Sequence, residues 1–203
     1  MSESSTPFEK ARLFAALNPP EAVRAALATL MRQVGPLPPG WRWLDPDALH
    51  LTVRFFGDVP VPEIPALQAR MHDMVARYGP IHLRLSGWGA FPSPRRAQVL
   101  WLGLTETDGD PLASLARDLA LPPPPAEKRP FKPHLTMARC RVEHDLSGLL
   151  TTLPAYSQAW MADGVALMRS FLHSSMAEHQ MISLHTQLSN HASESRFSHF
   201  LSD

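Results

Sequence analysis

One tripeptide, His-Leu-Thr, occurs twice in this chain of 203 residues, and it constrains the fold more than any other feature. It begins at His50 in "HLTVRFFG" and at His134 in "HLTMARC", and each copy opens an apolar run of strand length. A strand-like run and then a helical pattern precede each copy. The predicted elements are a strand at 11–18, a helix at 19–34 and a strand at 49–56, then a strand at 97–105, a helix at 110–120 and a strand at 134–140.

Two copies of a strand–helix–strand unit indicate an internal duplication and not a solenoid, because the unit occurs only twice. Packed face to face, the two units would bring both His-Leu-Thr strands close to a pseudo-twofold axis. Asn18 and Asp110 are the predicted N-caps of the two helices, and proline follows each in the first turn. A further helix at 62–78 and a C-terminal hairpin within 164–189 complete an α+β pattern.

Composition and net charge limit the classes of protein to which this chain can belong. Hydrophobic residues make up 44% and charged residues 19%, which is enough apolar material for a packed core. The formal net charge of zero argues against a broad nucleic-acid binder, but it permits recognition of one nucleotide or one strand end. The single cysteine and the polar N-terminus predict a cytoplasmic protein, and no apolar run is long enough to cross a membrane. We expect one domain at 11–189, with a flexible tail at 1–10 and a polar tail at 190–203.

The spacing within each tripeptide has a chemical consequence. Side chains alternate between the two faces of a strand, so His50 and Thr52 share a face, as do His134 and Thr136. An imidazole exchanges a proton near neutral pH, and a threonine hydroxyl can donate to an anionic oxygen. Two such sets facing each other across a groove would supply a base, an acid and two donors, which is what the hydrolysis of a phosphodiester by water requires.

A single His-x-Thr on a strand is usually structural, and only the second copy at an equivalent position favours catalysis. The remaining histidines, including His72, His82 and His179, show no comparable arrangement. The chain has no HExxH and no cluster of cysteine and histidine, so the sequence predicts no metal site.

Basic residues near the motifs fit an anionic ligand. Arg54 follows Thr52 by two positions and shares a face with His50 if the strand is regular. Arg139 follows His134 by five positions, so strict alternation points it away from that histidine. A role for Arg139 in the site therefore needs a bulge or the end of the strand.

Four segments resemble a known family. They are "RLFAALNPP", "HLTVRFFG", "VLWLGL" and "RPFKPHLTMAR". Together they resemble the 2H phosphoesterase superfamily and, within it, the bacterial RNA 2′,3′-cyclic phosphodiesterases, formerly called 2′-5′ RNA ligases. The similarity runs from about Arg12 to about Leu188, which is most of the chain.

The resemblance implies a bilobal α+β domain in which two antiparallel sheets line a central cleft, with the helices outside. It implies hydrolysis of RNA 2′,3′-cyclic phosphate ends to 2′-phosphomonoesters by a monomer, without metal or cofactor. His50 would be the proton donor and His134 the proton acceptor. Phosphate would be bound by four residues: Thr52, Thr136, Arg54 and Arg139.

Other functions stay open at this point. The proline run at 122–127 and "SSMAEHQM" in the final hairpin depart from the family pattern, which puts contacts with the RNA end and substrate size in question. The substrate could instead be a small cyclic nucleotide or a 2′,5′-linked oligonucleotide. A non-catalytic module that binds RNA ends is the third alternative, although binding alone does not require two titrating imidazoles.

Overall fold

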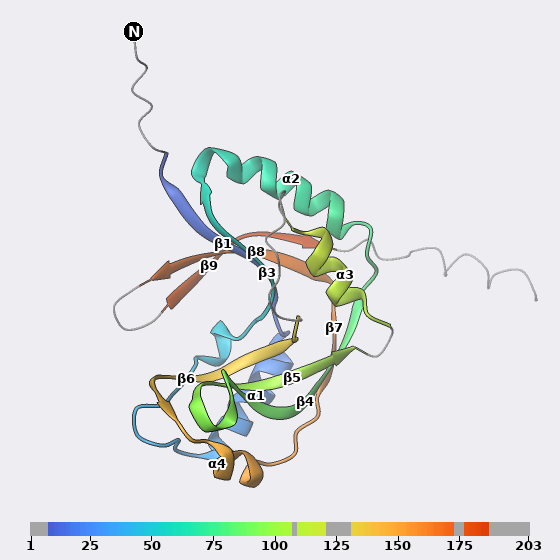
Figure 1. Ribbon diagram of the computed structural model, residues 1–203. Helices are drawn as coiled ribbons and strands as arrows, with labels where there is room; N and C mark the ends of the chain where they lie inside the picture. Colours follow the sequence, from blue (N-terminus) through green and yellow to red (C-terminus); the bar gives the residue numbers. More distant parts are fainter. Residues whose placement is uncertain (1–7, 107–108, 121–130, 173–176, 187–203) are drawn as a thin grey trace, which may run out of the picture.

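The computed structural model describes residues 8–106, 109–120, 131–172 and 177–186 (Figure 1). The predicted tail at 190–203, most of the tail at 1–10 and the proline run at 122–127 lie outside these ranges. The strands are β1 (Lys10–Leu17), β2 (Arg42–Trp43), β3 (Leu51–Pro60), β4 (Ile81–Phe91), β5 (Ala97–Glu106), β6 (His134–His144), β7 (Ala159–Ala162), β8 (Gly164–Leu172) and β9 (Ala177–Thr186). The α-helices are α1 (Glu21–Val34), α2 (Ile64–Val75), α3 (Pro111–Asp118) and α4 (Ser147–Thr152), and short 3-10 turns lie at Pro46–Ala48, Val61–Glu63 and Pro94–Arg96.

All strand pairs are antiparallel, and the sheet follows the order β7-β4-β5-β6-β3-β1-β8-β9, with β2 paired to β6. The predicted α+β class and the predicted strands at the two motifs are therefore confirmed. The two lobes are not separate sheets, however, because hydrogen bonding continues from one lobe to the other through β3 and β6.

The junction between the lobes carries the predicted pseudo-symmetry. β3 and β6 pair through Leu51 and Leu135, the residues that follow the two motif histidines. An antiparallel pair of equivalent residues is what a twofold axis through the pair produces. On either side of this junction, β1 pairs with β3 and β5 pairs with β6, so the strands of both duplicated units are arranged alike.

The helices bury their apolar faces in one main core. Val23, Leu27 and Leu30 of α1 join this core, together with Leu67 and Met71 of α2, and each is at most 5% exposed. The apolar spacing of three and four residues in each helix explains which face is buried. In Figure 1, α2 lies against the lobe formed by β1, β8 and β9, and α3 packs beside α2 and against β3. Helix α3 of the second unit therefore covers a strand of the first.

The helix starts differ from the prediction. The N-cap of α1 is Pro20, whose carbonyl accepts from the N–H groups of Val23 and Arg24, so Asn18 lies two residues before the cap. Asp110 is the N-cap residue of α3, but its side chain makes no capping bond. The carboxylate of Glu106 accepts from the N–H of Leu112 instead, at 2.8 Å. The helix α4 and the strand β7 were not predicted, since both are short and lack a clear period.

Candidate active site

A β-bulge follows the first motif and decides which side chains reach the cleft. Across the β1–β3 ladder, Ala16 lies opposite Thr52 and Ala15 opposite Arg54, so Val53 is an extra residue. Residues directly opposite each other in an antiparallel pair project from the same face. Beyond the bulge, Phe14 lies opposite Phe55. Phe55 is therefore on the same face as Thr52.

The same bulge corrects the prediction for Arg54. Its partner Ala15 belongs to the main core, whereas Phe14 and Ala16 project from the other face. Arg54 therefore projects from the face opposite to Thr52 and is 8% exposed. The prediction that Arg54 shares a face with His50 assumed a regular strand and is wrong for that reason. This register therefore gives no support to the predicted role of Arg54 in phosphate binding.

An equivalent bulge follows the second motif. Trp101 lies opposite Thr136 and Leu100 opposite Ala138, so Met137 is the extra residue. Arg139 then pairs with Val99, which projects from the same face as Trp101. The bulge that a role for Arg139 in the site requires is therefore present. Arg139 lies on the same face of β6 as His134. Its charge lowers the pKa of both His50 and His134.

The two motif histidines are held in the same way. Nδ1 of His50 donates to the carbonyl oxygen of Ala48 at 2.9 Å, and Nδ1 of His134 donates to that of Lys132 at 2.8 Å. A carbonyl oxygen only accepts, so the proton of each neutral ring resides on Nδ1. Each Nε2 is then left with a lone pair when the ring is neutral and becomes a donor when the ring is protonated. Each half-site thus presents one reactive nitrogen with a fixed tautomer.

The walls around the two rings differ. His50 contacts Phe14 and His179, with ring centroids 5.1 Å and 5.0 Å away. His134 contacts Phe91 at 4.9 Å, and Trp101 lies 6.0 Å away. The ammonium of Lys132 stands 4.4 Å from the centroid of the Trp101 ring, a cation–π distance. The His134 side is therefore aromatic and cationic, and the His50 side has a third imidazole.

Burial lowers the pKa of both motif histidines. For His50 the pKa falls from 6.5 to about 4, mainly because burial disfavours the imidazolium, and the nearby His179 and Arg139 add to the effect. The hydrogen bond to Ala48 opposes it. Burial also lowers the pKa of His134, with Arg139 and Lys132 contributing. The cationic surroundings that lower these pKa values are the kind that attract an anion, and a bound anion would raise both.

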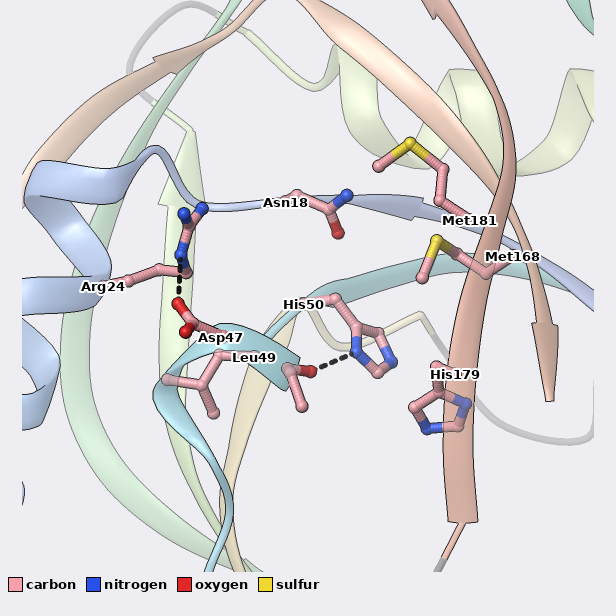
Figure 2. Close-up of a pocket in the computed structure, with 9 residues that line it drawn as sticks. Asn18, Arg24, Asp47, Leu49, His50, Met168, His179 and Met181 are labelled. Carbon is pink, nitrogen blue, oxygen red and sulfur yellow. Dashed lines mark hydrogen bonds and ion pairs between the residues drawn. The ribbon is translucent and has the colours of Figure 1, made fainter. Parts of the chain in front are cut away.

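A pocket of about 280 Å³ opens beside His50 (Figure 2). Asn18, Met168, His179 and Met181 line it together with His50, and the ion pair of Arg24 and Asp47 stands at its edge, at 3.1 Å. Figure 2 shows the His179 ring beside that of His50 and the two thioethers above them. The space is sufficient for a small ligand next to the reactive nitrogen.

No local pattern in the chain marks His179 or Asn18 as site residues. His179 is one histidine in an alternating strand and has no motif around it. It reaches the site only because β9 pairs with β8, and β8 with β1, which places it 5.1 Å from Phe14. Asn18 was assigned to a helix cap, and only the position of Pro20 shows that the cap lies elsewhere.

Within the described residues, no three side chains of histidine, cysteine, aspartate or glutamate gather closely enough to hold a metal ion. No helix in the described part of the chain combines the length and apolarity needed to span a bilayer.

The sequence is similar to those of known phosphoesterases. A family model described as LigT like Phosphoesterase matches residues 17–101. An RNA 2′,3′-cyclic phosphodiesterase of Thermus thermophilus is 35% identical over 176 residues, which are 79% of this chain and 82% of the relative. Another from Methanothermobacter thermautotrophicus is 30% identical over 137 residues, covering 65% of this chain and 72% of the relative.

Solved structures agree in fold. TT0787 of Thermus thermophilus superposes with a TM-score of 0.74 at 30% identity, covering 89% of this chain and 100% of that one. E. coli LigT complexed with 3′-AMP superposes with a TM-score of 0.68 at 22% identity, covering 88% and 99%. The second likeness concerns the fold alone. Sequence and fold together show that the chain belongs to the family of LigT-like phosphoesterases, within the 2H phosphoesterases.

Proposed function

We propose that this protein hydrolyses the 2′,3′-cyclic phosphate at RNA ends and leaves a 2′-phosphomonoester, by acid–base catalysis with two histidines and without a metal. The observation that carries the proposal is the pair of equivalent half-sites. Each has Nδ1 tied to a carbonyl and Nε2 left for proton transfer, and Arg139 lies close enough to lower the pKa of both rings. The names of the relatives support the choice of substrate. Both half-sites come from one chain, so a monomer suffices.

In this mechanism Nε2 of His134 takes a proton from water, and the water oxygen attacks phosphorus. The bond from phosphorus to O3′ breaks, and Nε2 of protonated His50 gives its proton to O3′. Thr52, Thr136 and Arg139 donate to the phosphate oxygens as charge builds on them. Proton exchange with solvent then returns His50 to its protonated form and His134 to its neutral form.

The lowered pKa values bear on the proton donor. With a pKa of about 4, His50 is mostly neutral at pH 7 in the unliganded protein. Its protonation is therefore coupled to binding of the anionic substrate, which favours the imidazolium. We expect a bell-shaped dependence of kcat on pH, because one imidazole must be charged and the other neutral.

The test is product analysis on an RNA oligomer that ends in a 2′,3′-cyclic phosphate. We expect a 2′-phosphate product, undiminished by EDTA, and a loss of roughly 10³-fold or more in kcat for His50→Ala and for His134→Ala. His82→Ala, an exposed histidine on β4, is the matched control and should retain full activity. Near-normal turnover by His50→Ala, or a 3′-phosphate product, would overturn the mechanism.

A second experiment separates the acid from the base. An acyclic phosphodiester with a 4-nitrophenyl leaving group needs little help from an acid, because 4-nitrophenolate leaves unprotonated. The variant that lacks the acid should therefore recover much of its activity on this substrate, and the variant that lacks the base should not. Recovery by His134→Ala, with none by His50→Ala, would exchange the two roles.

A single nucleoside 2′,3′-cyclic phosphate is the alternative substrate. The pocket of about 280 Å³ beside His50 lies at the lower end of the usual size for ligand sites, which favours a small or terminal ligand. Comparing kcat/KM for a cyclic mononucleotide and for an oligomer with the same terminal base distinguishes the two. A large advantage for the oligomer would show that contacts beyond the terminal nucleotide contribute.

A further inference from the structure

The pseudo-symmetry shows where the two halves of the cleft differ. Ala16 lies opposite Thr52, and Trp101 lies opposite Thr136, so the two residues occupy equivalent positions. In the half of His134 the indole of Trp101 fills the space next to the motif. In the half of His50 the equivalent residue is Ala16, which is fully buried beside Phe14 and Met168.

The strands around Trp101 are adapted to its size. A Cβ atom at Gly89 would overlap the indole ring, and one at Gly103 would lie 3.3 Å from it and closer still to the carbonyl oxygen of Ser86. Two glycines on neighbouring strands therefore make room for this side chain. The wall beside His134 is thus built around one indole ring, and a pocket of about 280 Å³ lies beside His50.

The chemistry of the open pocket is specific. Its walls include the thioethers of Met168 and Met181, the side chain of Leu49 and the imidazole of His179. Asn18 supplies an amide, and within the described residues no hydrogen bond to that amide is found. The amide does not cap α1, because the N-cap of that helix is Pro20, two residues after Asn18. A pocket lined by thioethers, imidazoles and an amide combines a surface for a flat ring with a donor and an acceptor for its edge.

We propose that this pocket binds the nucleobase of the terminal ribonucleotide, with the edge of the base on the Asn18 amide and its face against the methionine side chains. The inference rests on the proposed function, since it assumes a cyclic phosphate between the two histidines. An asparagine amide matches the paired donor and acceptor on a base edge, and thioether sulfur packs well against aromatic rings.

The direction of the reaction agrees with this placement. In a 2′,3′-cyclic phosphate the leaving oxygen O3′ stays attached to the terminal nucleoside. The nucleoside must therefore lie on the side of the histidine that protonates O3′, and the opposite side has to admit only water. The structure provides room beside His50 and a filled wall of Trp101 beside His134. A nucleoside in the pocket beside His50 is therefore compatible with His50 as the proton donor.

The experiment compares two substrates that differ only in the base. One is adenosine 2′,3′-cyclic phosphate, and the other is methyl riboside 2,3-cyclic phosphate, which has a methoxy group in its place. We expect Asn18→Ala to lower kcat/KM for the adenosine substrate about tenfold, as for the loss of one or two hydrogen bonds, and to leave the riboside unchanged. Met181→Ala changes a half-exposed side chain. We expect it, too, to lower kcat/KM for the adenosine substrate and to leave kcat/KM for the riboside unchanged. Gln68→Ala removes an amide from α2 and is the control.

The outcomes separate this inference from the proposed function. Equal kcat/KM for the two substrates in the unmodified protein, or equal losses on both in Asn18→Ala and Met181→Ala, would overturn the base pocket while hydrolysis stands. Failure of the unmodified protein to hydrolyse either substrate or a cyclic-phosphate RNA end would overturn the proposed function itself. Circular dichroism of each variant shows whether a loss on both substrates reflects unfolding.

Discussion

At the scale of single residues, position after the motif histidine matters more than residue type. Arg54 follows His50 by four residues and Arg139 follows His134 by five, and the bulges send the first to the core side and the second to the cleft side. The residue equivalent to Arg139 in the first unit is Phe55, which is 65% exposed. One half of the cleft therefore has a cation where the other has an aromatic ring.

This difference predicts opposite behaviour of two arginine variants. Arg139→Met should raise KM for a cyclic-phosphate substrate and lower kcat/KM by about 10²-fold, because it removes a charged donor for the phosphate. Arg54→Met is the matched control, and we expect its KM to stay unchanged while its thermal stability decreases, because a buried guanidinium with partners is lost. A rise in KM for Arg54→Met as large as that for Arg139→Met would contradict the face assignment.

At the scale of elements, strands β4 and β5 hold the wall of the His134 half. They pair from Leu83 to Phe91 on β4, and Gly89 lies opposite Trp101 in this ladder. The absence of a side chain at Gly89 lets the indole lie across the neighbouring strand, where it supports His134 and the ammonium of Lys132. The glycine is thus required by packing and not by backbone conformation.

A methyl group at that position should be costly. We expect Gly89→Ala to lower the free energy of unfolding by about 1–3 kcal/mol, because the indole must move out of a packed site. The displaced Trp101 should also reduce kcat/KM. Gly148→Ala on α4 is the control, since an added Cβ there meets nothing within 4 Å, and it should be neutral or slightly stabilising. Chemical denaturation of both variants measures the difference, and an unaltered midpoint for Gly89→Ala would count against this packing.

At the scale of the whole molecule, the cleft contains several imidazoles that the fold keeps from being charged. Burial is the first cause of the lowered pKa of His50, His134 and His179, and Arg139 lowers all three further. A concentration of unprotonated imidazoles and cationic side chains around one cleft makes the site receptive to an anion. It also couples the stability of the fold to pH.

The sign of this coupling follows from the direction of the pKa shifts. A histidine with a lowered folded pKa binds protons more readily in the unfolded chain, so stability decreases as pH falls through the unfolded value of about 6.5. For His50 the decrease continues until the pH approaches about 4, its folded pKa. We therefore expect the melting temperature to fall by several degrees between pH 7 and pH 4.5.

Differential scanning calorimetry of the protein and of His50→Gln measures this effect. The variant lacks one of the shifted groups, so its melting temperature should depend less steeply on pH over the same range. His82→Gln should behave like the unmodified protein, because His82 is exposed on β4. Identical slopes for all three proteins would show that burial of His50 does not contribute to the acid sensitivity.

Several features were predictable from local patterns. Helical spacing identified α1, α2 and α3, and alternation with β-branched and aromatic residues identified most strands, because these periods reflect which face of each element is buried. The short elements β7 and α4 have too few residues to show a period. The predicted cap at Asn18 is wrong, because Pro20 is the N-cap of α1 and its carbonyl accepts from the first N–H groups. Asp110 is the N-cap residue of α3 as predicted, but the side chain of Glu106 accepts from the N–H of Leu112 in place of its carboxylate.

The duplication, the pair of His-x-Thr half-sites and the α+β class follow from the sequence alone, because each depends on residue types at a fixed local period. The side chains that accompany the motif histidines are known only from the folded chain. A bulge of one residue reverses every later side chain on a strand, and that moved Arg139 into the cleft and Arg54 out of it. His179 and Asn18 reach the pocket through pairings between strands far apart in the chain, and no local pattern encodes such proximity.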